Sequence, residues 1–336
     1  MNRIKKAAAI TVTAILIGLS PFFFGYQCKA KPIEKNVTTT TTTVSTTTVE
    51  TTLQENIAST QETLEKKIEG MKITAGAFNI QIFGQSKLAK KEVMEILVDI
   101  VGKYDILAVQ EVRDIEGVVI PSFLEMINKE YNGIYKVVAS EPLGRSTSKE
   151  NYAFIYNSQK INIIKSFVYD DVNDDFERDP FIVVARYGKS DATFIVVHTK
   201  PADAPSEIDN LVKVIAYADA RNGEDSDIIT EGDFNMAPTY YTLTRYTELM
   251  NKDKYVMLIT NEMKTTLSGK PFDRAFMTKS ALEDYVDGSA GAYEYFQEQE
   301  IIKIMQENNV EKKDVSDHLP ILYQLEEGHD TDLIKN

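Results

Sequence analysis

Short runs of apolar residues, some alternating with polar ones and some continuous, fill the chain from Met71 onward and predict a succession of β-strands. Strands are expected at residues 73–80, 105–110, 135–139, 152–156, 161–168, 181–187, 193–198, 227–231, 273–277 and 319–325. Apolar residues at helical spacing predict helices at 87–101, at about 206–221 and within 293–307. The middle strands have no long helix between them, so several neighbours should be antiparallel. The expected fold class is α/β, a four-layer sandwich of two mixed β-sheets flanked by helices.

The first 70 residues follow a different pattern. Arg3, Lys5 and Lys6 precede an uncharged stretch at 7–28, which is typical of a signal peptide or a single membrane helix. Residues 38–52 include 11 threonines, a low-complexity tract with too little apolar surface to pack. The expected organisation is a signal peptide or membrane anchor over 1–30, a Thr-rich linker or stalk with a short helical lead-in over 31–70, one folded domain over 71–325 and a polar tail over 326–336. The protein is therefore expected to be extracellular, either secreted or tethered to the cell surface.

Composition narrows the possible chemistry. The 336 residues are 43% hydrophobic and 26% charged, with a formal charge of −14. After residue 70 there are 29 basic and 45 acidic side chains, so the folded part carries −16. This excludes a protein that coats nucleic acid through a general positive field. A polyanionic partner must instead be bound by a local site on the surface. The single cysteine, Cys28, lies in the leader, which excludes a thiolate zinc site or a catalytic thiol in the domain.

Polar side chains gather where the predicted strands end. Asp233 and Asn235 follow one strand and point the same way, because side chains repeat every two residues. Such a motif alone is more often a turn that caps its own backbone, and Asn79 at the end of the first strand can be explained in the same way. Glu111 differs because it ends the apolar run 106–109, where an unpaired carboxylate is costly unless it meets a cation or a metal ion.

Hydrolysis of a phosphodiester gives a reason for this set of residue types. Its substrate is an anion that repels hydroxide, so carboxylates such as Glu111 must hold a divalent ion. Histidine is suited to proton transfer near neutral pH. Of only three histidines, His198 ends an apolar strand and His318 directly follows Asp317, whereas His329 lies in the polar tail.

The order of these segments resembles the deoxyribonuclease I family, within the endonuclease, exonuclease and phosphatase fold. The matching residues are 77–81, 83–84, 104–106, 110–114, 140–145, 149–150, 178–180, 198, 204, 207–209, 232–235, 273–274 and 316–318. Several of these motifs are shared by the wider superfamily, including sphingomyelinases and inositol phosphatases. The run at 140–145 and the segment around His198 look specific to deoxyribonucleases, and the resemblance covers about 71–325.

The resemblance implies a metal site and a catalytic set. Mg²⁺ or Mn²⁺ would be bound by Glu111 with Asn79, Asp233 and Asp317 near it. The catalytic set would consist of His198 paired with Glu150, His318 paired with Asp273, and Asp233 and Asn235. An in-line displacement needs a base for the entering water and an acid for the leaving oxygen, so the two histidines are expected on opposite sides of the phosphorus. Which histidine is the acid stays open.

The resemblance also implies DNA contacts. Arg113 matches a residue that reaches into the minor groove, and Arg178, Tyr240 and Arg145 are further candidates for DNA binding. Ser148 stands where the family usually has a tyrosine that packs on a deoxyribose, and Asn151 replaces a basic residue, so groove contact is expected to be weaker.

An acidic segment lies where the family binds a structural Ca²⁺. Residues 170–179 hold six acidic side chains, among them Asp171, Asp174 and Asp175. A solvated acidic loop is an equal alternative to calcium binding, because such loops are common on acidic surfaces.

These inferences together predict an exported, metal-dependent endonuclease that cuts DNA to 5′-phosphorylated fragments with little sequence specificity. DNA is the expected partner, no obligate protein partner is implied, and a monomer is expected. One alternative is a phosphodiesterase of the same fold that acts on a lipid headgroup, as a sphingomyelinase does. Another is a surface binding module that has lost activity. The intact set of candidate catalytic residues argues against this second alternative.

Overall fold

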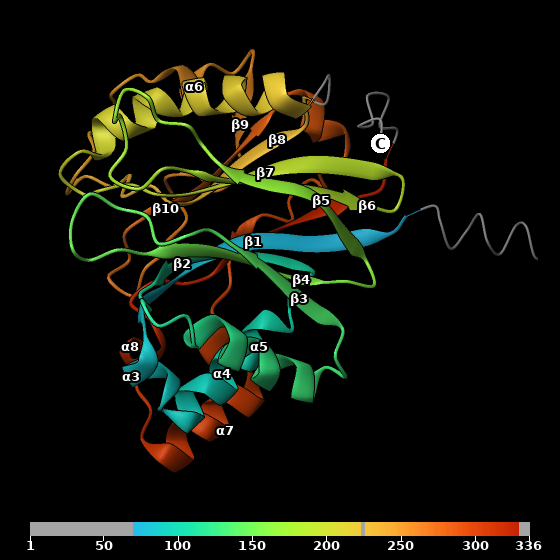
Figure 1. The fold of residues 1–336 in the computed structure, drawn as a ribbon, viewed down its shortest axis with the longest axis vertical. Helices are drawn as coiled ribbons and strands as arrows, with labels where there is room; N and C mark the ends of the chain where they lie inside the picture. The colour runs from blue at the N-terminus through green and yellow to red at the C-terminus, as the bar shows by residue number, and fades with distance from the viewer. Residues whose placement is uncertain (1–69, 223–225, 329–336) are drawn as a thin grey trace, which may run out of the picture. The chain divides into compact units, whose positions relative to one another are not determined.

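The computed structural model describes residues 70–222 and 226–328, which belong to one compact unit. Two six-stranded sheets lie face to face between two helical layers (Figure 1). The predicted four-layer sandwich is therefore confirmed. The predicted leader, Thr-rich linker and lead-in helix lie outside the described residues.

The first sheet has the strand order β11-β12-β1-β2-β4-β3. Its strands are β1 (Lys72–Phe83), β2 (Ile106–Val112), β3 (Tyr135–Ala139), β4 (Asn151–Asn157), β11 (Gly291–Ala292) and β12 (Ile321–Glu326). β1 and β2 are parallel, whereas the other neighbours in this sheet are antiparallel. The last strand includes Glu326, so the fold runs past the expected boundary at 325.

The second sheet has the order β5-β6-β7-β8-β10-β9. Its strands are β5 (Ile161–Val168), β6 (Phe181–Tyr187), β7 (Ser190–His198), β8 (Ile228–Asp233), β9 (Tyr255–Met257) and β10 (Asp273–Thr278). β7 and β8 are parallel, and their register places His198 opposite Asp233. β10 is antiparallel to β8 and places Asp273 opposite Asp233.

Helices cover the outer face of each sheet. The first sheet carries α4 (Lys91–Val101), α5 (Val119–Glu130) and α7 (Gln299–Asn308), and the second carries α6 (Ala204–Asn222). Shorter elements are α3 (Gln85–Leu88), α8 (Lys312–Val315), η1 (Glu248–Met250), η2 (Ser280–Glu283) and η3 (Tyr295–Gln297). One apolar core lies between the sheets and one lies under each helical layer. Central strands such as β7 are buried along their whole length, which is why they appear in the sequence as continuous apolar runs.

Two helical predictions differ from the structure. The helix expected at 87–101 is divided into α3 and α4, because the backbone of Lys90 is extended, with a φ of −88° and a ψ of 92°. The Lys87 Nζ turns inward and donates to the carbonyl oxygens of Ile80, Gln81 and Val315, each at 2.7 Å. Helix α5 was not predicted, since Pro121 interrupts its pattern. Pro121 is the third residue of α5, within the first turn, where a missing backbone N–H breaks no helical hydrogen bond. Within residues 70–222 and 226–328, no helix is long and apolar enough to cross a membrane.

Candidate active site

The site begins where the two parallel strand pairs end. Asn79 ends the regular part of β1, and Glu111, His198 and Asp233 lie at the ends of β2, β7 and β8. The Asn79 Nδ2 atom donates to Glu111 Oε1 at 3.0 Å and to Asp233 Oδ2 at 3.1 Å. One amide therefore connects a carboxylate of the first sheet to a carboxylate of the second.

The backbone shortly after Asn79 adopts an unfavourable conformation next to the site. Gln81 and Ile82 have φ values of +38° and +52°, in the left-handed region that a β-branched residue rarely adopts. A residue other than glycine in this region raises the free energy of the folded state by about 1–3 kcal/mol. The turn directs the Gln81 N–H to Asn79 Oδ1 at 2.9 Å and the Ile82 N–H to Glu111 Oε2 at 2.8 Å. The strain is thus coupled to the orientation of both site residues.

The charge of Glu111 is balanced by an arginine close to it in sequence. The φ of Glu111 is +62°, and the register of β2 shifts on both sides between Val109 and Val112, so the strand bulges at this residue. The Arg113 Nη2 atom lies 3.0 Å from Glu111 Oε2. One cation expected beside Glu111 is therefore a guanidinium of the chain itself.

Both histidines are oriented by buried carboxylates. His198 Nδ1 lies 2.8 Å from Glu150 Oε2, and His318 Nδ1 lies 2.8 Å from Asp273 Oδ2. Each imidazole directs its Nε2 atom toward Asp233 Oδ2, at 3.6 Å from His198 and 3.5 Å from His318. The structure therefore brings together both predicted pairs and aims them at one point.

The charges around the imidazoles favour the protonated form. Burial opposes a charge on His318, but Asp273 and Asp233 outweigh it and raise the pKa of His318 to about 10. Burial also opposes the charge on His198, yet the hydrogen bond to Glu150 and the charge of Asp233 raise its pKa. Burial alone would raise the pKa of Glu150, whereas His198 and then two arginines lower it to about 2. Glu150 is therefore a permanent anion behind His198.

Neighbouring polar residues hold the ends of the strands. Asn235 has a φ of +49°, donates its backbone N–H to Asp233 Oδ1 at 2.8 Å, and donates from Nδ2 to the carbonyl of Thr199 at 2.9 Å. The Ser316 hydroxyl donates to the carbonyl of Asn79 at 2.7 Å and accepts the His318 N–H at 3.0 Å. Asp317 is exposed at the edge of the site, and its charge contributes to the raised pKa of His318.

A cluster of oxygen and nitrogen donors can receive a divalent ion. Asp233, Asp273 and His318 each offer a buried ligand atom within 4.8 Å of one another. Glu111 is connected to this cluster, because the Asn79 Nδ2 atom donates to both Glu111 Oε1 and Asp233 Oδ2. Carboxylate and amide oxygens are the ligands that hard cations such as Mg²⁺ prefer.

Comparison with known proteins agrees with this architecture. A profile of the Endonuclease/Exonuclease/phosphatase family matches residues 76–318. Deoxyribonuclease-1 of Bos taurus is 32% identical over 240 residues, which cover 67% of this chain and 84% of the relative. Deoxyribonuclease-1 of Gallus gallus is 33% identical over 258 residues, covering 73% of this chain and 89% of the relative. The chain belongs to the deoxyribonuclease I family.

Solved structures that resemble this chain share its fold. An endonuclease/exonuclease/phosphatase family protein from Bacteroides thetaiotaomicron superposes with a TM-score of 0.56 at 14% identity, covering 80% of this chain and 99% of that protein. The catalytic domain of human nocturnin with a bound sulfate anion gives a TM-score of 0.54 at 14% identity, and the match covers 76% of this chain and 93% of that domain. The deoxyribonuclease I-like fold expected from the resemblance is therefore confirmed.

The residues expected on the DNA side of a deoxyribonuclease I-like site take different positions. Arg113 Nη2 lies 2.9 Å from Glu150 Oε1, and Arg178 donates to the same oxygen at 3.0 Å and to the carbonyl of His198 at 3.1 Å. Both arginines belong to the carboxylate network of the site. Arg145 lies apart from it and pairs with Asp174 in the acidic segment.

Tyr240 borders the site through an aromatic neighbour. Its side chain is 41% exposed, and its ring packs on Phe272 with centroids 5.6 Å apart. Phe272 in turn lies 6.1 Å from the ring of His318. The structure thus places Tyr240 on the outer side of one catalytic candidate.

Three buried charged residues support the site and were not among the predicted site residues, although Glu207 and Arg274 lie in segments that carry the family resemblance. Lys87 joins the strained end of β1 to the segment before Ser316, and burial lowers its pKa to about 8. Glu207 accepts the N–H groups of Glu177 and Lys200, each at 3.1 Å, and burial raises its pKa to about 7. Arg274 donates from Nη2 to the carbonyl of Met236 and to Asn261 Oδ1, each at 2.8 Å. A lysine at a helix start usually faces solvent, so the sequence carried no signal for the role of Lys87.

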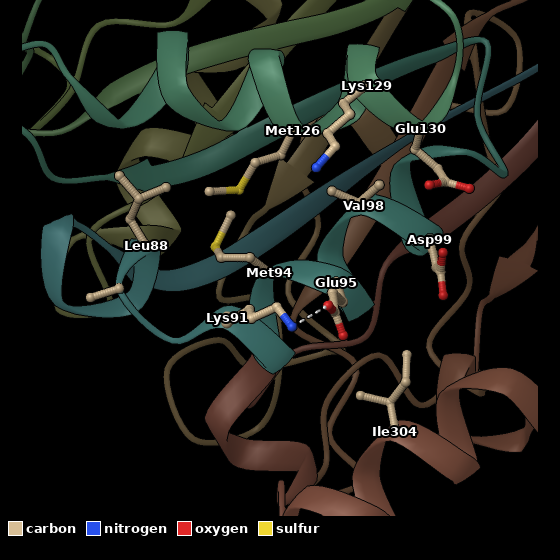
Figure 2. A pocket seen from close by; sticks show the side chains of 11 residues that line it. Leu88, Lys91, Met94, Glu95, Val98, Asp99, Met126, Lys129, Glu130 and Ile304 are labelled. Carbon is tan, nitrogen blue, oxygen red and sulfur yellow. Dashed lines mark ion pairs between the residues drawn. The ribbon is translucent and has the colours of Figure 1, made fainter.

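A cavity elsewhere in the molecule is separate from this site. It has a volume of 510 Å³ and lies in the helical layer, where Met94 and Val98 of α4 face Met126 of α5 and Ile304 of α7 (Figure 2). Charged residues such as Glu95 surround the apolar part. None of the candidate catalytic residues lines this cavity.

Proposed function

We propose that this chain is an exported, divalent-metal-dependent endonuclease that hydrolyses DNA to 5′-phosphorylated fragments with little sequence specificity. The observation that carries the proposal is the convergence of two carboxylate-bound imidazoles on Asp233, in a member of the deoxyribonuclease I family. The protein is proposed to act as a monomer, either secreted or tethered to the cell surface. Family membership favours DNA over a lipid headgroup as substrate, and the complete set of site residues argues against an inactive binding module.

The imidazoles are proposed to move the two protons of the reaction. One, in its neutral form, takes the proton of the attacking water, and the other, in its protonated form, gives a proton to the leaving oxygen. A carboxylate on each Nδ1 atom fixes the tautomer and leaves Nε2 to face the substrate. Asn235 is proposed to hold the scissile phosphate, since its backbone N–H donates to Asp233 Oδ1 and so places the residue beside the carboxylate that both imidazoles face.

A divalent ion is proposed to be held by Glu111, with Asn79, Asp233 and Asp317 near it. Hard oxygen donors at the ends of β1, β2 and β8 suit Mg²⁺ or Mn²⁺. When bound, such an ion offsets the charge of the phosphate and polarises its oxygens.

DNA binding is proposed to rest on a few local contacts. Arg113 and Arg178 lie within the site, Tyr240 lies on its outer side, and Arg145 lies beside the acidic segment. The Debye length is roughly 10 Å at 0.1 M salt, so nearby arginines and a metal ion can bind a phosphate despite the distant acidic surface.

A structural Ca²⁺ is proposed for the segment 170–179. Asp171 Oδ1 is buried and, within the described part of the chain, has no hydrogen-bond partner. Burial, with the charges of Asp171 and Asp174, raises the pKa of Asp179 to about 6. A cation would satisfy the buried oxygen and relieve this repulsion.

The proposed function is tested by nicking of supercoiled plasmid with Mg²⁺, with and without a chelator. Activity should disappear with the chelator, and the new ends should carry 5′-phosphates. Glu111→Gln should lose most of the rate, whereas Glu125→Gln, an exposed change on α5, should be normal. Unchanged nicking by folded Glu111→Gln would overturn the metal assignment, and hydrolysis of sphingomyelin but not DNA would favour the lipid alternative.

A further inference from the structure

The ammonium group of Lys87 is buried against the strained end of β1. The residue is only 9% exposed. A protonated lysine has three N–H donors, and the Nζ atom lies 2.7 Å from each of three carbonyl oxygens, those of Ile80, Gln81 and Val315. Because these three bonds occupy all of its donors, Lys87 acts through the backbone that it holds and not by binding a phosphate.

Two of these carbonyls belong to the peptide units that hold the proposed metal ligands. The carbonyl of Ile80 shares a peptide unit with the Gln81 N–H, which donates to Asn79 Oδ1 at 2.9 Å. The carbonyl of Gln81 shares a peptide unit with the Ile82 N–H, which donates to Glu111 Oε2 at 2.8 Å. Each unit is therefore bonded at both ends, to the ammonium through its oxygen and to a candidate metal ligand through its nitrogen.

Peptide geometry makes this arrangement directional. The C=O and N–H bonds of a trans peptide unit lie in one plane and point in opposite directions, so a bond that fixes the oxygen also fixes the direction of the hydrogen. A cation at the oxygen polarises the unit and strengthens its N–H as a donor. The ammonium of Lys87 therefore directs both N–H groups toward the ligands and strengthens both bonds.

The conformation that Lys87 holds is one that the chain would otherwise leave. Gln81 and Ile82 have φ values of +38° and +52°, which are unfavourable for residues with side chains. Such strain persists only where the surrounding structure holds it. Without the ammonium, both peptide units can rotate toward a more favourable conformation, and their N–H groups would then turn away from Asn79 and Glu111.

The ammonium is itself held by segments other than β1. Its third bond is to the carbonyl of Val315, and the hydroxyl of the next residue, Ser316, donates to the carbonyl of Asn79 at 2.7 Å. The backbone N–H of Lys87 donates to the carbonyl of Gly84 at 3.0 Å, at the start of α3. The position of the ammonium is thus determined by α3 and by the segment before Ser316 as well as by β1.

We propose that Lys87 is a positioning residue for the divalent ion, because it holds the two peptide units that orient Asn79 and Glu111 and so keeps both side chains ready to bind. This inference rests on the metal site of the proposed function and adds the residue that prepares it. Loss of a residue that orients metal ligands typically lowers metal affinity by roughly 10–100-fold.

The test measures the binding of Mn²⁺ to the full chain by electron paramagnetic resonance of the free ion, beside Lys87→Met and Lys87→Gln. Glutamine keeps a neutral donor for the carbonyls, so it preserves the fold if methionine does not. Glu111→Gln identifies the relevant ion, because the binding that this change removes belongs to the proposed site. Both Lys87 variants should bind this ion about tenfold or more weakly than the parent.

The same variants are compared in DNA cleavage. The Mg²⁺ concentration that gives half of the maximal rate should rise by about tenfold or more, and saturating Mg²⁺ should restore most of the parental rate. A merely structural role of Lys87 would lower the melting temperature and leave the ion affinity of the folded protein unchanged. That result would overturn the inference.

Lys90→Met is the matched control. The Lys90 Nζ atom lies 3.2 Å from Asp314 Oδ1 of α8, so Lys90 joins nearly the same two segments as Lys87. Its side chain, however, is 52% exposed and is paired with a carboxylate instead of with the backbone of β1. The control should bind Mn²⁺ with the parental affinity.

A second measurement needs no variant. In the metal-free parent, the amide hydrogens of Gln81 and Ile82 should exchange slowly with solvent, because both are bonded before the ion arrives. Hydrogen exchange followed by NMR measures this. Exchange as fast as in an unfolded peptide would overturn the inference, since the two peptide units would then not be held.

The outcomes separate this inference from the proposed function. Parental or tighter Mn²⁺ binding by a folded Lys87 variant would overturn the role of Lys87 alone, because the ammonium would then have no effect on the ligands or would only repel the ion. Equal Mn²⁺ binding by the parent and Glu111→Gln would overturn the metal assignment of the proposed function. A parent protein that binds the ion but cleaves no DNA would overturn the nuclease function.

Discussion

At the scale of single residues, Asp233 is the centre of the site. One of its oxygens receives the amide of Asn79 and faces the Nε2 atoms of His198 and His318. The motif around Asp233 could be recognised in the sequence, but the bonds that orient it could not. Lys87, which holds the strained turn beside Asn79, belongs to a pattern that equally predicts a solvated helix face.

Arg113 allows a prediction at this scale. Its guanidinium lies between Glu111 and Glu150, and its side chain is 31% exposed. Arg113→Ala would leave two carboxylates facing each other with less compensation, so we expect cleavage of DNA and hydrolysis of a small chromogenic phosphodiester both to fall about tenfold or more. Steady-state kinetics on both substrates measures this.

Arg221→Ala is the control for that experiment, because Arg221 stacks on Tyr217 of α6 instead of entering the site. If Arg113→Ala affected only DNA cleavage, Arg113 would act purely as a groove contact and its place in the carboxylate network would be incidental.

At the scale of elements, β8 and β12 are joined through the core between the sheets. The Tyr323 hydroxyl donates to Glu231 Oε2 at 2.9 Å, and burial raises the pKa of Glu231 to about 8 despite this bond. The sequence predicted the strand that contains Glu231, but a glutamate in a strand gives no sign of being fully buried. The neutral carboxyl is compatible with the apolar core, and the ionised form is not.

This buried acid predicts a pH dependence of stability. The pKa of Glu231 in the folded protein lies above its ordinary value of 4.5, so between 4.5 and about 8 the folded state keeps a proton that the unfolded chain releases. The free energy of unfolding should therefore fall as pH rises through this window, by about 1.4 kcal/mol per pH unit at most. Glu231→Gln keeps an acceptor for Tyr323 and should remove this slope, making the variant more stable than the parent near pH 8 but not near pH 4.5. Urea unfolding across the window checks this, and equal slopes in both proteins would contradict it.

The acidic segment 170–179 gives a second prediction at this scale. If its carboxylates bind Ca²⁺, millimolar Ca²⁺ should raise the melting temperature, because an ion that binds only the folded state stabilises it. Asp171→Asn should lose this increase, since Asp171 supplies the buried unpaired oxygen. Asp253→Asn, an exposed change elsewhere, should keep it. The same calcium response in both variants would identify the segment as a solvated acidic loop.

At the scale of the whole molecule, the fold was largely predictable and the details of the site were not. The strands β3, β5 and β6 begin and end at the predicted residues. Buried strands consist of continuous or alternating apolar residues, so their bounds can be recognised in the sequence. Helix α5 was missed because a proline in the first turn resembles a helix breaker. The pairing of His198 with Glu150 and of His318 with Asp273 was predicted from the family resemblance. The partners are 48 and 45 positions apart in the sequence, so spacing alone cannot predict that they meet.

The most direct test of the account is single-turnover DNA cleavage by His198→Ala, His318→Ala and the double variant, with His329→Ala from the polar tail as the control. Each single change in the site should cost orders of magnitude in rate, and the double change should cost far less than the product of the two, because the imidazoles act as one unit on one phosphate. The control should cleave at the parental rate. Near-normal cleavage by folded His198→Ala, or fully multiplicative losses in the double variant, would contradict a mechanism in which both histidines work together.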